Sequence, residues 1–461
     1  MIKKQFHPAS FRDSSGYVFL DEDVVKRVVN PIYFKQYRAL KENEFFEKLF
    51  KLGLLIEHEE IASNATEIII KPEKIPFFTY PYEWSFNQYK EAALLTLKLQ
   101  KICLENNFSL KDASAFNITF YKGKAIFVDT LSFDFYKENS PWRSFKQFIE
   151  HFLGPLVLAR YHGADALKLM TGFIDGIPLK LLSSMLPFKT KLNPFLYSNI
   201  HLLAKYEDKY SKDSKVNDKE VALSKNGQIN IIKSLYNYIK KLSLKEDSEW
   251  GEYYDKTNYA VDAFNEKSKI INKWIDEIHV KTLIDVGGND GTFVREIKSK
   301  LETALVCDID NNAVDYNYKT LKTNKETNVL PFVLDVLSPT PAIGFNNKER
   351  DSFISRIAAF SPDVTLALAL IHHMSLSGNV PFDKSAEFFA TFSKHLIIEF
   401  PKRDDSWVAY LLKRKGDFSK HFDAYNIENF ENSYFNYFDL VYKLPIKNTK
   451  RVMFFFKRKN E

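Results

Sequence analysis

The sequence predicts an α/β region built on a mainly parallel sheet in the C-terminal half of the chain, preceded by an α+β region. From Thr282 onward, apolar runs of strand length alternate with helical stretches, a pattern typical of parallel strands connected by helices. Before residue 150, short strand-like runs instead surround two long helix candidates. A chain of 461 residues is too long for one ordinary core, so we expect two or three domains.

Composition narrows the class of protein. Hydrophobic residues make up 45% and charged residues 27% of the chain, the balance of a globular protein in water. The net charge of +6 is mild for this length, so nucleic acid is not an expected partner. Only Cys103 and Cys307 are present, which excludes a disulfide framework and a cysteine-rich metal site. No apolar run is long enough for a membrane span, and the first residues lack the apolar core of a signal peptide, so we expect a cytoplasmic protein.

The N-terminal region is expected to begin with strands and to contain two helices of about 20 residues. The second helix, Ser85–Glu105, has Ala92, Leu95, Leu99 and Ile102 on one face. A turn at Lys122–Gly123 separates the last two strands. The expected elements, in order, are strands at Tyr17–Leu20 and Val24–Val29, a helix at Tyr33–Leu54, strands at Glu67–Lys71 and Phe77–Tyr80, the helix at Ser85–Glu105, and strands at Phe116–Tyr121 and Ala125–Thr130.

Helices and a polar connector lead to the C-terminal sheet. Residues 141–204 are expected to be helical. Residues 205–247 are polar and lysine-rich, with a helix expected near Ile231–Leu244. The aromatic segment Trp250–Tyr254 could either cover a ligand or pack on the sheet. The five expected strands are Leu283–Val286, Ala304–Ile309, Val329–Leu334, Val364–Leu370 and His395–Phe400.

A glycine cluster after the first of these strands is the sharpest local signal, because glycine is scarce in this chain. Strand Leu283–Val286 ends in a loop that contains Gly287, Gly288 and Gly291, and a helix is expected from Thr292. Glycines allow a sharp turn and let a ligand approach the backbone, while the helix N-terminus faces that ligand. The alternative is a tight turn with no ligand. The spacing matches neither the dinucleotide fingerprint nor a P-loop.

Carboxylates follow the first three strands at the same edge of the expected sheet. Asp285 ends the first strand, Asp308 the second, and Asp335 follows the third. Ligands of open α/β sheets bind at this edge, where a carboxylate after the second strand accepts hydrogen bonds from ribose hydroxyls. The alternative for Asp308 or Asp310 is to cap the next helix, and we assign that role to Asp310.

In this order, these signals resemble the class I S-adenosylmethionine (SAM)-dependent methyltransferases over residues 255–461. The segment Asp285–Gly291 is similar to their first motif, and Asp308, Asp335 and Leu370–Met374 to later ones. The resemblance implies a Rossmann-like sheet with SAM as cofactor. It implies that the glycines shape the cofactor loop, and that the three aspartates contact the methionine end, the ribose and the adenine, respectively.

Two adjacent histidines, His372 and His373, follow the fourth strand, where the resemblance implies that the methyl group meets its acceptor. An imidazole has an ordinary pKa near neutrality, so either histidine could act as general base toward an acceptor hydroxyl. The alternative is that both only shape the cofactor pocket by packing and hydrogen bonding. We therefore take both as tentative catalytic residues.

A second motif lies in the N-terminal half, where Asp112 is followed by Asn117, a hairpin and Asp129. This arrangement resembles the catalytic loop and metal-binding aspartate of protein kinases and aminoglycoside phosphotransferases. The resemblance implies Asp112 as catalytic base, with Asn117 and Asp129 as ligands of magnesium-bound ATP, if the domain is active. The chain departs from that pattern: Leu110 and Lys111 stand before Asp112, and Thr-Leu rather than Phe-Gly follows Asp129. These departures favour a degenerate domain that binds a ligand without catalysing phosphoryl transfer. Lys26 and Arg27 are both candidates for a phosphate-binding cation.

Most of the chain resembles a narrower group, the bacterial methyltransferases related to the nodulation protein NoeA. The similar segments are Tyr80–Ser85, Ser109–Ser114, Val128–Phe133, Asp175–Pro178 and Ile397–Phe400. The resemblance implies a SAM-dependent methyltransferase, and its association with nodulation points to glycans. We expect the acceptor to be a glycan or a small metabolite and the kinase-like domain to aid substrate binding.

The expected domains are a kinase-like domain at 1–204, a polar helical connector at 205–254 and a methyltransferase domain at 255–461. The alternative function is an ATP-dependent small-molecule phosphotransferase in the N-terminal domain, alone or beside the methyltransferase. The sequence does not identify the methyl acceptor or the oligomeric state.

Overall fold

The computed structural model describes residues 5–22, 24–212, 222–244, 261–297 and 301–459. The chain divides into two compact units. The N-terminal unit comprises Met1–Asp247 together with Ala342–Arg350, and the C-terminal unit comprises Ser248–Pro341 together with Asp351–Glu461. The expected aromatic segment Trp250–Tyr254 and part of the expected connector lie outside the described residues.

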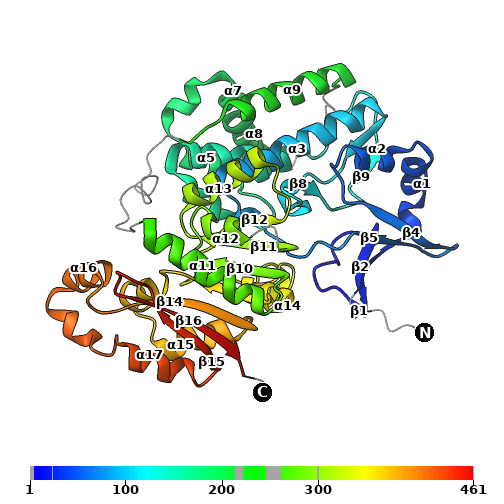
Figure 1. Ribbon diagram of the computed structural model, residues 1–461. Coiled ribbons are helices and arrows are strands. Elements are labelled where there is room, and N and C mark those ends of the chain that lie inside the picture. The colour runs from blue at the N-terminus through cyan, green and yellow to red at the C-terminus, as the bar shows by residue number, and fades with distance from the viewer. Residues whose placement is uncertain (1–4, 23, 213–221, 245–260, 298–300, 460–461) are drawn as a thin grey trace. The chain divides into compact units, whose positions relative to one another are not determined.

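An antiparallel sheet opens the N-terminal unit, with strand order β1-β2-β3-β5-β4 (Figure 1). Two helices between β3 and β4 correct the expected single helix at Tyr33–Leu54: the chain breaks at Glu44, whose φ of 53° is left-handed. The polar strand β4 is not among the expected strands, and the segment Phe77–Tyr80 is not a strand. The elements are β1 (Gln5–Phe6), β2 (Gly16–Asp21), β3 (Val24–Val29), η1 (Pro31–Tyr33), α1 (Phe34–Glu42), α2 (Phe45–Lys51), β4 (His58–Ser63) and β5 (Ile68–Pro72).

Two short strand pairs follow the long helix α3 (Phe86–Glu105), which begins where Ser85 and Gln88 form a capping box. Strand β6 (Phe108–Leu110) pairs with β9 (Phe133–Phe135), and β7 (Ile118–Tyr121) pairs with β8 (Lys124–Phe127). The expected turn between β7 and β8 is confirmed, with positive φ at Lys122 and Gly123. The loops between β6 and β7 and between β8 and β9 are joined by backbone hydrogen bonds, from Lys111 N–H to Ser132 O and from Val128 N–H to Asn117 O, both at 2.8 Å.

Helices complete the N-terminal unit, as expected for residues 141–204. Helix α9 begins six residues earlier than predicted. The elements are η2 (Pro81–Glu83), η3 (Ala115–Asn117), α4 (Phe145–Phe148), η4 (Ile149–Leu153), α5 (Gly154–His162), η5 (Ala164–Thr171), α6 (Leu179–Met185), η6 (Phe188–Leu192), α7 (Pro194–Leu196), η7 (Tyr197–His201), α8 (Leu202–Lys212) and α9 (Lys225–Lys241).

The C-terminal unit is built on a seven-stranded sheet of order β12-β11-β10-β13-β14-β16-β15. The five expected strands are present and parallel to one another. A C-terminal antiparallel hairpin, not predicted from the sequence, adds β16 beside β14 and β15 at the edge (Figure 1). The strands are β10 (Thr282–Val286), β11 (Thr303–Asp308), β12 (Val329–Val333), β13 (Val364–Ala367), β14 (His395–Pro401), β15 (Phe438–Pro445) and β16 (Arg451–Arg458).

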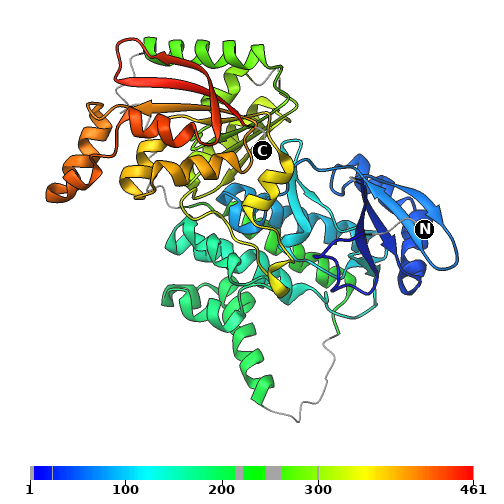
Figure 2. The ribbon, with the colours of Figure 1, turned by 90° about the horizontal axis from the view of Figure 1, so that it is seen from below.

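Helices cover both faces of this sheet (Figures 1 and 2). On one face, Trp274 and Ile271 of α11 and Val294 of α12 join a core with alternate strand residues. On the other face, Phe382 of α15 packs on Phe400 of β14 and Phe430 of α17 packs on Phe454 of β16, with ring centroids 6.0 and 5.1 Å apart, respectively. The helices are α11 (Val261–Glu277), α12 (Thr292–Ile297), α13 (Asn311–Asn324), η9 (Phe345–Asn347, in the N-terminal unit), α14 (Phe353–Phe360), η10 (His373–Ser377), α15 (Phe382–Ala390), α16 (Ser406–Arg414), η11 (Gly416–Phe422) and α17 (Ile427–Tyr434).

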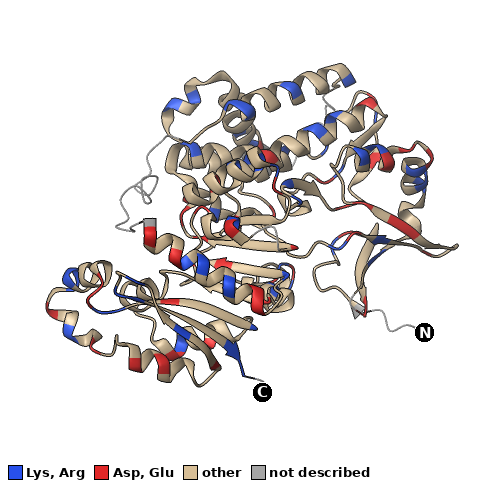
Figure 3. Cartoon of the chain, viewed as in Figure 1, with Lys and Arg blue, Asp and Glu red and all other residues tan. Residues whose placement is uncertain are grey.

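Positively and negatively charged residues alternate with one another along the described helices and strands, for example along α11 (Figure 3). This distribution accords with the small net charge of the sequence. Among the described residues, no helix combines the length and the apolar composition that a membrane span requires. The parallel strands all end at one edge of the C-terminal sheet, and the predicted cofactor residues lie at that edge.

Candidate functional site

The glycine loop after β10 is a left-handed turn that brings backbone close to side chains. Gly287 and Gly291 both have φ of +75°, a conformation that favours glycine. Gly288 has no such φ, but a Cβ there would lie 2.8 Å from Asp285 Cγ and from Val306 Cγ1. At Gly291 a Cβ would meet the Asn317 side chain at 2.6 Å. A side chain at any of the three positions would therefore be strained or would clash. Gly288 and Gly291 let the loop pack directly against neighbouring side chains.

Asp285, at the end of β10, is a buried carboxylate without a partner. Its side chain is 1% exposed, and neither of its oxygens has a hydrogen-bond partner. Burial raises the pKa of Asp285 to about 7, against the charge of Lys267, which lowers it, while Asp308 and Asp290 raise it further. A buried carboxylate without donors costs free energy, so this geometry is suited to a ligand that brings a positive charge.

Asp308 ends β11 and holds the glycine loop in place. Its two oxygens accept hydrogen bonds from the backbone N–H of Asn289 and of Asp310, both at 2.9 Å. Burial is the main cause that raises the pKa of Asp308 above its ordinary value. Asp310 caps α13 through Asn312 N–H at 2.8 Å, as predicted. Asp335 follows β12 in a half-buried loop, where it accepts a hydrogen bond from Leu337 N–H at 2.9 Å.

The histidine pair lies just after β13, which ends three residues earlier than expected, at Ala367. His372 is 1% exposed and its Nδ1 has no hydrogen-bond partner, whereas His373 is half-buried. The two ring centroids are 4.3 Å apart. Burial lowers the pKa of both imidazoles, and the charge of Arg451 lowers each of them further. Both rings are therefore neutral at physiological pH, the state that a proton acceptor needs.

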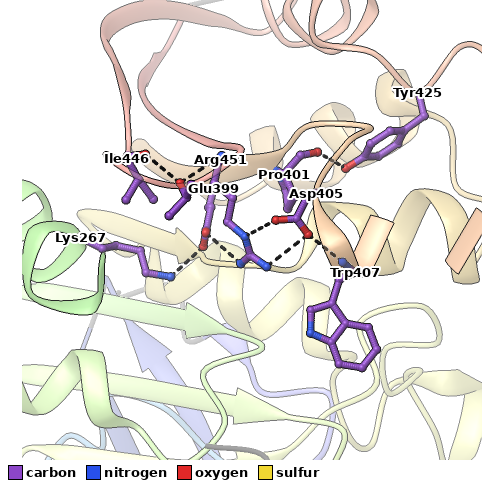
Figure 4. Close-up of polar contacts among 9 residues, drawn as sticks. Lys267, Glu399, Pro401, Asp405, Trp407, Tyr425, Ile446 and Arg451 are labelled. Carbon is purple, nitrogen blue, oxygen red and sulfur yellow. Dashed lines mark hydrogen bonds and ion pairs between the residues drawn. The ribbon is translucent and has the colours of Figure 1, made fainter. Parts of the chain in front are cut away.

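A buried network of charged side chains, which was not predicted as a unit, includes the Arg451 that acts on both histidines. Figure 4 shows this network. Glu399, on β14, forms ion pairs with Lys267 Nζ at 2.8 Å and with Arg451 Nη1 at 3.1 Å. Arg451 Nε also donates to Asp405 Oδ2 at 2.8 Å. All four side chains are less than 9% exposed. Two cations and two anions balance within the network, which lets these charges remain buried.

Lys267 connects this network to the cofactor loop. Its ammonium lies 4.6 Å from the centroid of the Phe293 ring, in the helix that follows the loop. Burial lowers the pKa of Lys267, while the charge of Glu399 and, more weakly, that of Asp285 raise it. Glu399 lies within the predicted strand His395–Phe400. The sequence carries no signal for Lys267 or Arg451, which lie on elements far away along the chain.

The N-terminal unit brings together the second set of predicted residues. Asp112 and Asn117 lie in the loop between β6 and β7, and Asn117 O accepts a hydrogen bond from Val128 N–H at 2.8 Å, next to Asp129. Burial and then the charge of Asp129 raise the pKa of Asp112. Of the two candidate cations on β3, Arg27 pairs with Asp129 at 2.5 Å.

The other candidate, Lys26, lies outside this group and pairs with Asp21 at 2.5 Å. The predicted cofactor residues and the predicted kinase-like residues belong to different units. No cluster of three or more His, Cys, Asp or Glu side chains is arranged to hold a metal ion in the described part of the chain.

Comparison with known proteins gives one extensive relative. No family model matches the chain. The nodulation protein NoeA of Rhizobium meliloti (strain 1021) is 30% identical over 467 residues, which cover 97% of this chain and 95% of that protein.

Two solved structures are similar to part of the chain at low identity. The N-methyltransferase NodS of Bradyrhizobium japonicum WM9, in complex with S-adenosylhomocysteine (SAH), is 10% identical, with 46% of this chain and 94% of that chain covered and a TM-score of 0.32. The magnesium protoporphyrin IX methyltransferase ChlM of Synechocystis PCC 6803, with bound SAH, is 11% identical, with 46% and 93% covered and a TM-score of 0.31.

Proposed function

The chain belongs to the family of the nodulation protein NoeA, and we propose that its C-terminal unit transfers the methyl group of SAM to a small-molecule or glycan acceptor. The observation that carries this proposal is the unpaired carboxylate of Asp285 beside the glycine loop. The sheet supports it, since its parallel strands bring the glycine loop, Asp285 and Asp308 to the edge where open α/β sheets bind ligands.

The residues at the strand ends fit the cofactor. Asp285 would bind the α-ammonium group of SAM, which supplies the positive charge that this buried carboxylate lacks. Gly287 and Gly291 give the loop its two left-handed residues, and Gly288 lets the backbone lie against the Asp285 side chain, so the loop would border the cofactor with its backbone. Asp308 would accept hydrogen bonds from the ribose hydroxyls with lone pairs that the loop amides leave free, and Asp335 would lie at the adenine.

When bound, SAM supplies a methyl carbon activated by the neighbouring sulfonium, so the protein has mainly to position the acceptor. The neutral rings of His372 and His373 follow β13, where an acceptor would meet the methyl group. His373, which is half-buried, is the better placed to accept a proton from an acceptor hydroxyl, and His372 would orient it. If the acceptor needs no proton removed, both residues act by packing and hydrogen bonding.

For the N-terminal unit we propose a kinase-like domain that aids substrate binding. The antiparallel strand order with helices between β3 and β4 supports this interpretation, as do the loops that carry Asp112, Asn117 and Asp129. The second candidate function, phosphoryl transfer from magnesium-bound ATP, would use Asp112 as base. Abolition of ATP turnover by Asp112→Ala would support it. However, the donor set around Asp129 does not fit a divalent cation, because Arg27 already occupies this carboxylate.

The role of the N-terminal unit is best tested in the full chain. Arg12 Nε donates to Glu349 at 2.7 Å, and the Arg350 guanidinium lies 5.0 Å from the centroid of Phe116. Segment Ala342–Arg350 thus packs within the N-terminal unit although it follows β12 in sequence. Deletion of residues 1–200 would strip this segment of its partners, so loss of activity in the truncated chain would not separate recruitment from misfolding.

The proposed activity is tested by label transfer. The purified chain is incubated with SAM labelled on its methyl carbon and a low-molecular-mass bacterial extract, beside the Asp285→Asn chain. We expect the wild-type chain to transfer label and the variant to transfer little. Asp363→Asn is the matched control, since this aspartate lies at the opposite edge of the same sheet, where it binds Lys281 N–H and Thr282 N–H. Equal transfer by wild-type and Asp285→Asn chains would contradict the proposal.

A further inference from the structure

The carboxylate of Asp129 is fully engaged by the protein itself. Arg27 Nη1 lies 2.5 Å from Asp129 Oδ1, which also accepts a hydrogen bond from Leu131 N–H at 3.2 Å. The other oxygen, Oδ2, accepts a hydrogen bond from the Ser132 hydroxyl. A carboxylate that serves as a metal ligand needs an oxygen directed at the cation, and here both oxygens are directed at protein donors.

The pair between Arg27 and Asp129 is shielded from water, with side chains only 13% and 14% exposed. Burial acts to raise the pKa of Asp129, but the Arg27 charge and the Ser132 and Leu131 hydrogen bonds outweigh it and lower the pKa below its ordinary value. A guanidinium stays charged at every physiological pH and binds carboxylates in a planar geometry. Arg27 is therefore a permanent cation at the position where the kinase-like interpretation requires magnesium.

The neighbouring carboxylate, Asp112, does not replace Asp129 as a metal ligand. Asp112 Oδ1 accepts hydrogen bonds from Gln147 Nε2 at 2.7 Å and from Ser114 N–H at 3.0 Å. Burial raises the pKa of Asp112, and the charge of Asp129 raises it further. A divalent cation entering here would also have to approach the Arg27 guanidinium, which repels it.

We propose that the ligand site of the N-terminal unit works without a divalent cation, with Arg27 supplying at Asp129 the positive charge that a metal supplies in phosphotransferases. The proposal rests on the kinase-like interpretation of this unit and gives it a specific form. With Arg27 on Asp129, this unit has no metal at that carboxylate with which to transfer a phosphoryl group from ATP. The N-terminal unit is then a binding module of the methyltransferase.

Manganese binding in the full-length chain tests this directly, because Mn²⁺ substitutes for Mg²⁺ and is counted by its paramagnetic resonance signal. The wild-type chain is expected to bind no Mn²⁺ through Asp129. Arg27→Met frees that carboxylate, and we expect it to raise Mn²⁺ affinity at least about tenfold. The double variant Arg27→Met, Asp129→Asn should lose the gain. Arg38→Met, which alters another arginine of the same unit, on α1, is the control and should behave as the wild type.

A second arm uses the wild-type chain alone and so does not depend on a variant that folds. ATP affinity is measured by titration calorimetry with magnesium and with a chelator, and the two affinities are expected to be equal. If ATP binds in neither buffer but Arg27→Met gains a manganese site, the inference stands and ATP is excluded as the ligand. The inference would be overturned if the wild type bound Mn²⁺ or Mg-ATP and Asp129→Asn abolished this binding. It would also be overturned if a folded Arg27→Met chain bound Mn²⁺ no more tightly than the wild type. SAM titration of the same samples reports on the methyltransferase proposal separately.

Discussion

Replacement of Asp285 by asparagine should stabilise the cofactor-free protein while weakening its hold on SAM. Burial raises the pKa of Asp285 from 3.8 to about 7. A pKa difference of one between the folded and unfolded chains corresponds to about 1.4 kcal/mol, so ionising this group in the folded chain costs about 4 kcal/mol of stability at pH 8. The cost is absent below the unfolded pKa, grows as the pH rises toward 7 and is constant above. The neutral amide introduced by Asp285→Asn avoids it.

The same change removes a charged partner from the cofactor. A hydrogen bond to a charged group is worth about 1.5–3 kcal/mol, so SAM affinity should fall about 10- to 150-fold. In the wild type, affinity should rise as the pH increases through 7 and Asp285 ionises, whereas the stability of the cofactor-free chain falls as the pH approaches 7. Both slopes should flatten in Asp285→Asn.

The assays are chemical denaturation of the cofactor-free chain and calorimetric titration with SAM, each from pH 6 to pH 8. A destabilised Asp285→Asn chain that binds SAM as tightly as the wild type would refute this prediction. Asp363→Asn should leave SAM affinity and its pH dependence unchanged, because Asp363 lies at the other edge of the sheet.

Three further sets of substitutions test other parts of the site. His372→Ala and His373→Ala should each reduce methyl transfer while SAM affinity stays near the wild-type value; unchanged transfer in both would exclude a general base here. Glu399→Gln leaves Lys267 and Arg451 without their shared anion and should lower the free energy of unfolding by about 3–5 kcal/mol. By contrast, Glu302→Gln breaks an ion pair with Lys281 that is exposed to solvent and should leave the free energy of unfolding nearly unchanged; equal losses in the two variants would contradict this prediction. Gly288→Ala would drive a Cβ to 2.8 Å from the Asp285 carboxylate and should abolish SAM binding, whereas Gly172→Ala, with 3.7 Å to its nearest neighbour, should not.

The parallel part of the sheet and the glycine loop are well predicted from the sequence, because their signals are local. A buried apolar strand, three glycines and a helix start lie within about a dozen residues around Asp285. Capping by Asp310 is likewise a property of a few neighbouring residues. Such features depend on backbone conformation and hydrogen bonds that the chain makes with itself over short distances.

Other features depend on distant parts of the chain and carry no local signal. Lys267 and Glu399 are 132 residues apart, and Arg451 is a further 52 residues on. Their sequence neighbours do not reveal that they share a buried network. The break at Glu44 is hidden because the apolar periodicity continues through it, although the backbone there is left-handed. Strand β4 is hidden because it is polar and largely exposed.

The most direct test of the central claim is a calorimetric titration of the full-length chain with SAM and with SAH. The geometry around Asp285 predicts one site per chain for each compound, with competition between them and with affinity lost in Asp285→Asn. A folded chain that binds neither compound would contradict the assignment of this unit as a methyltransferase.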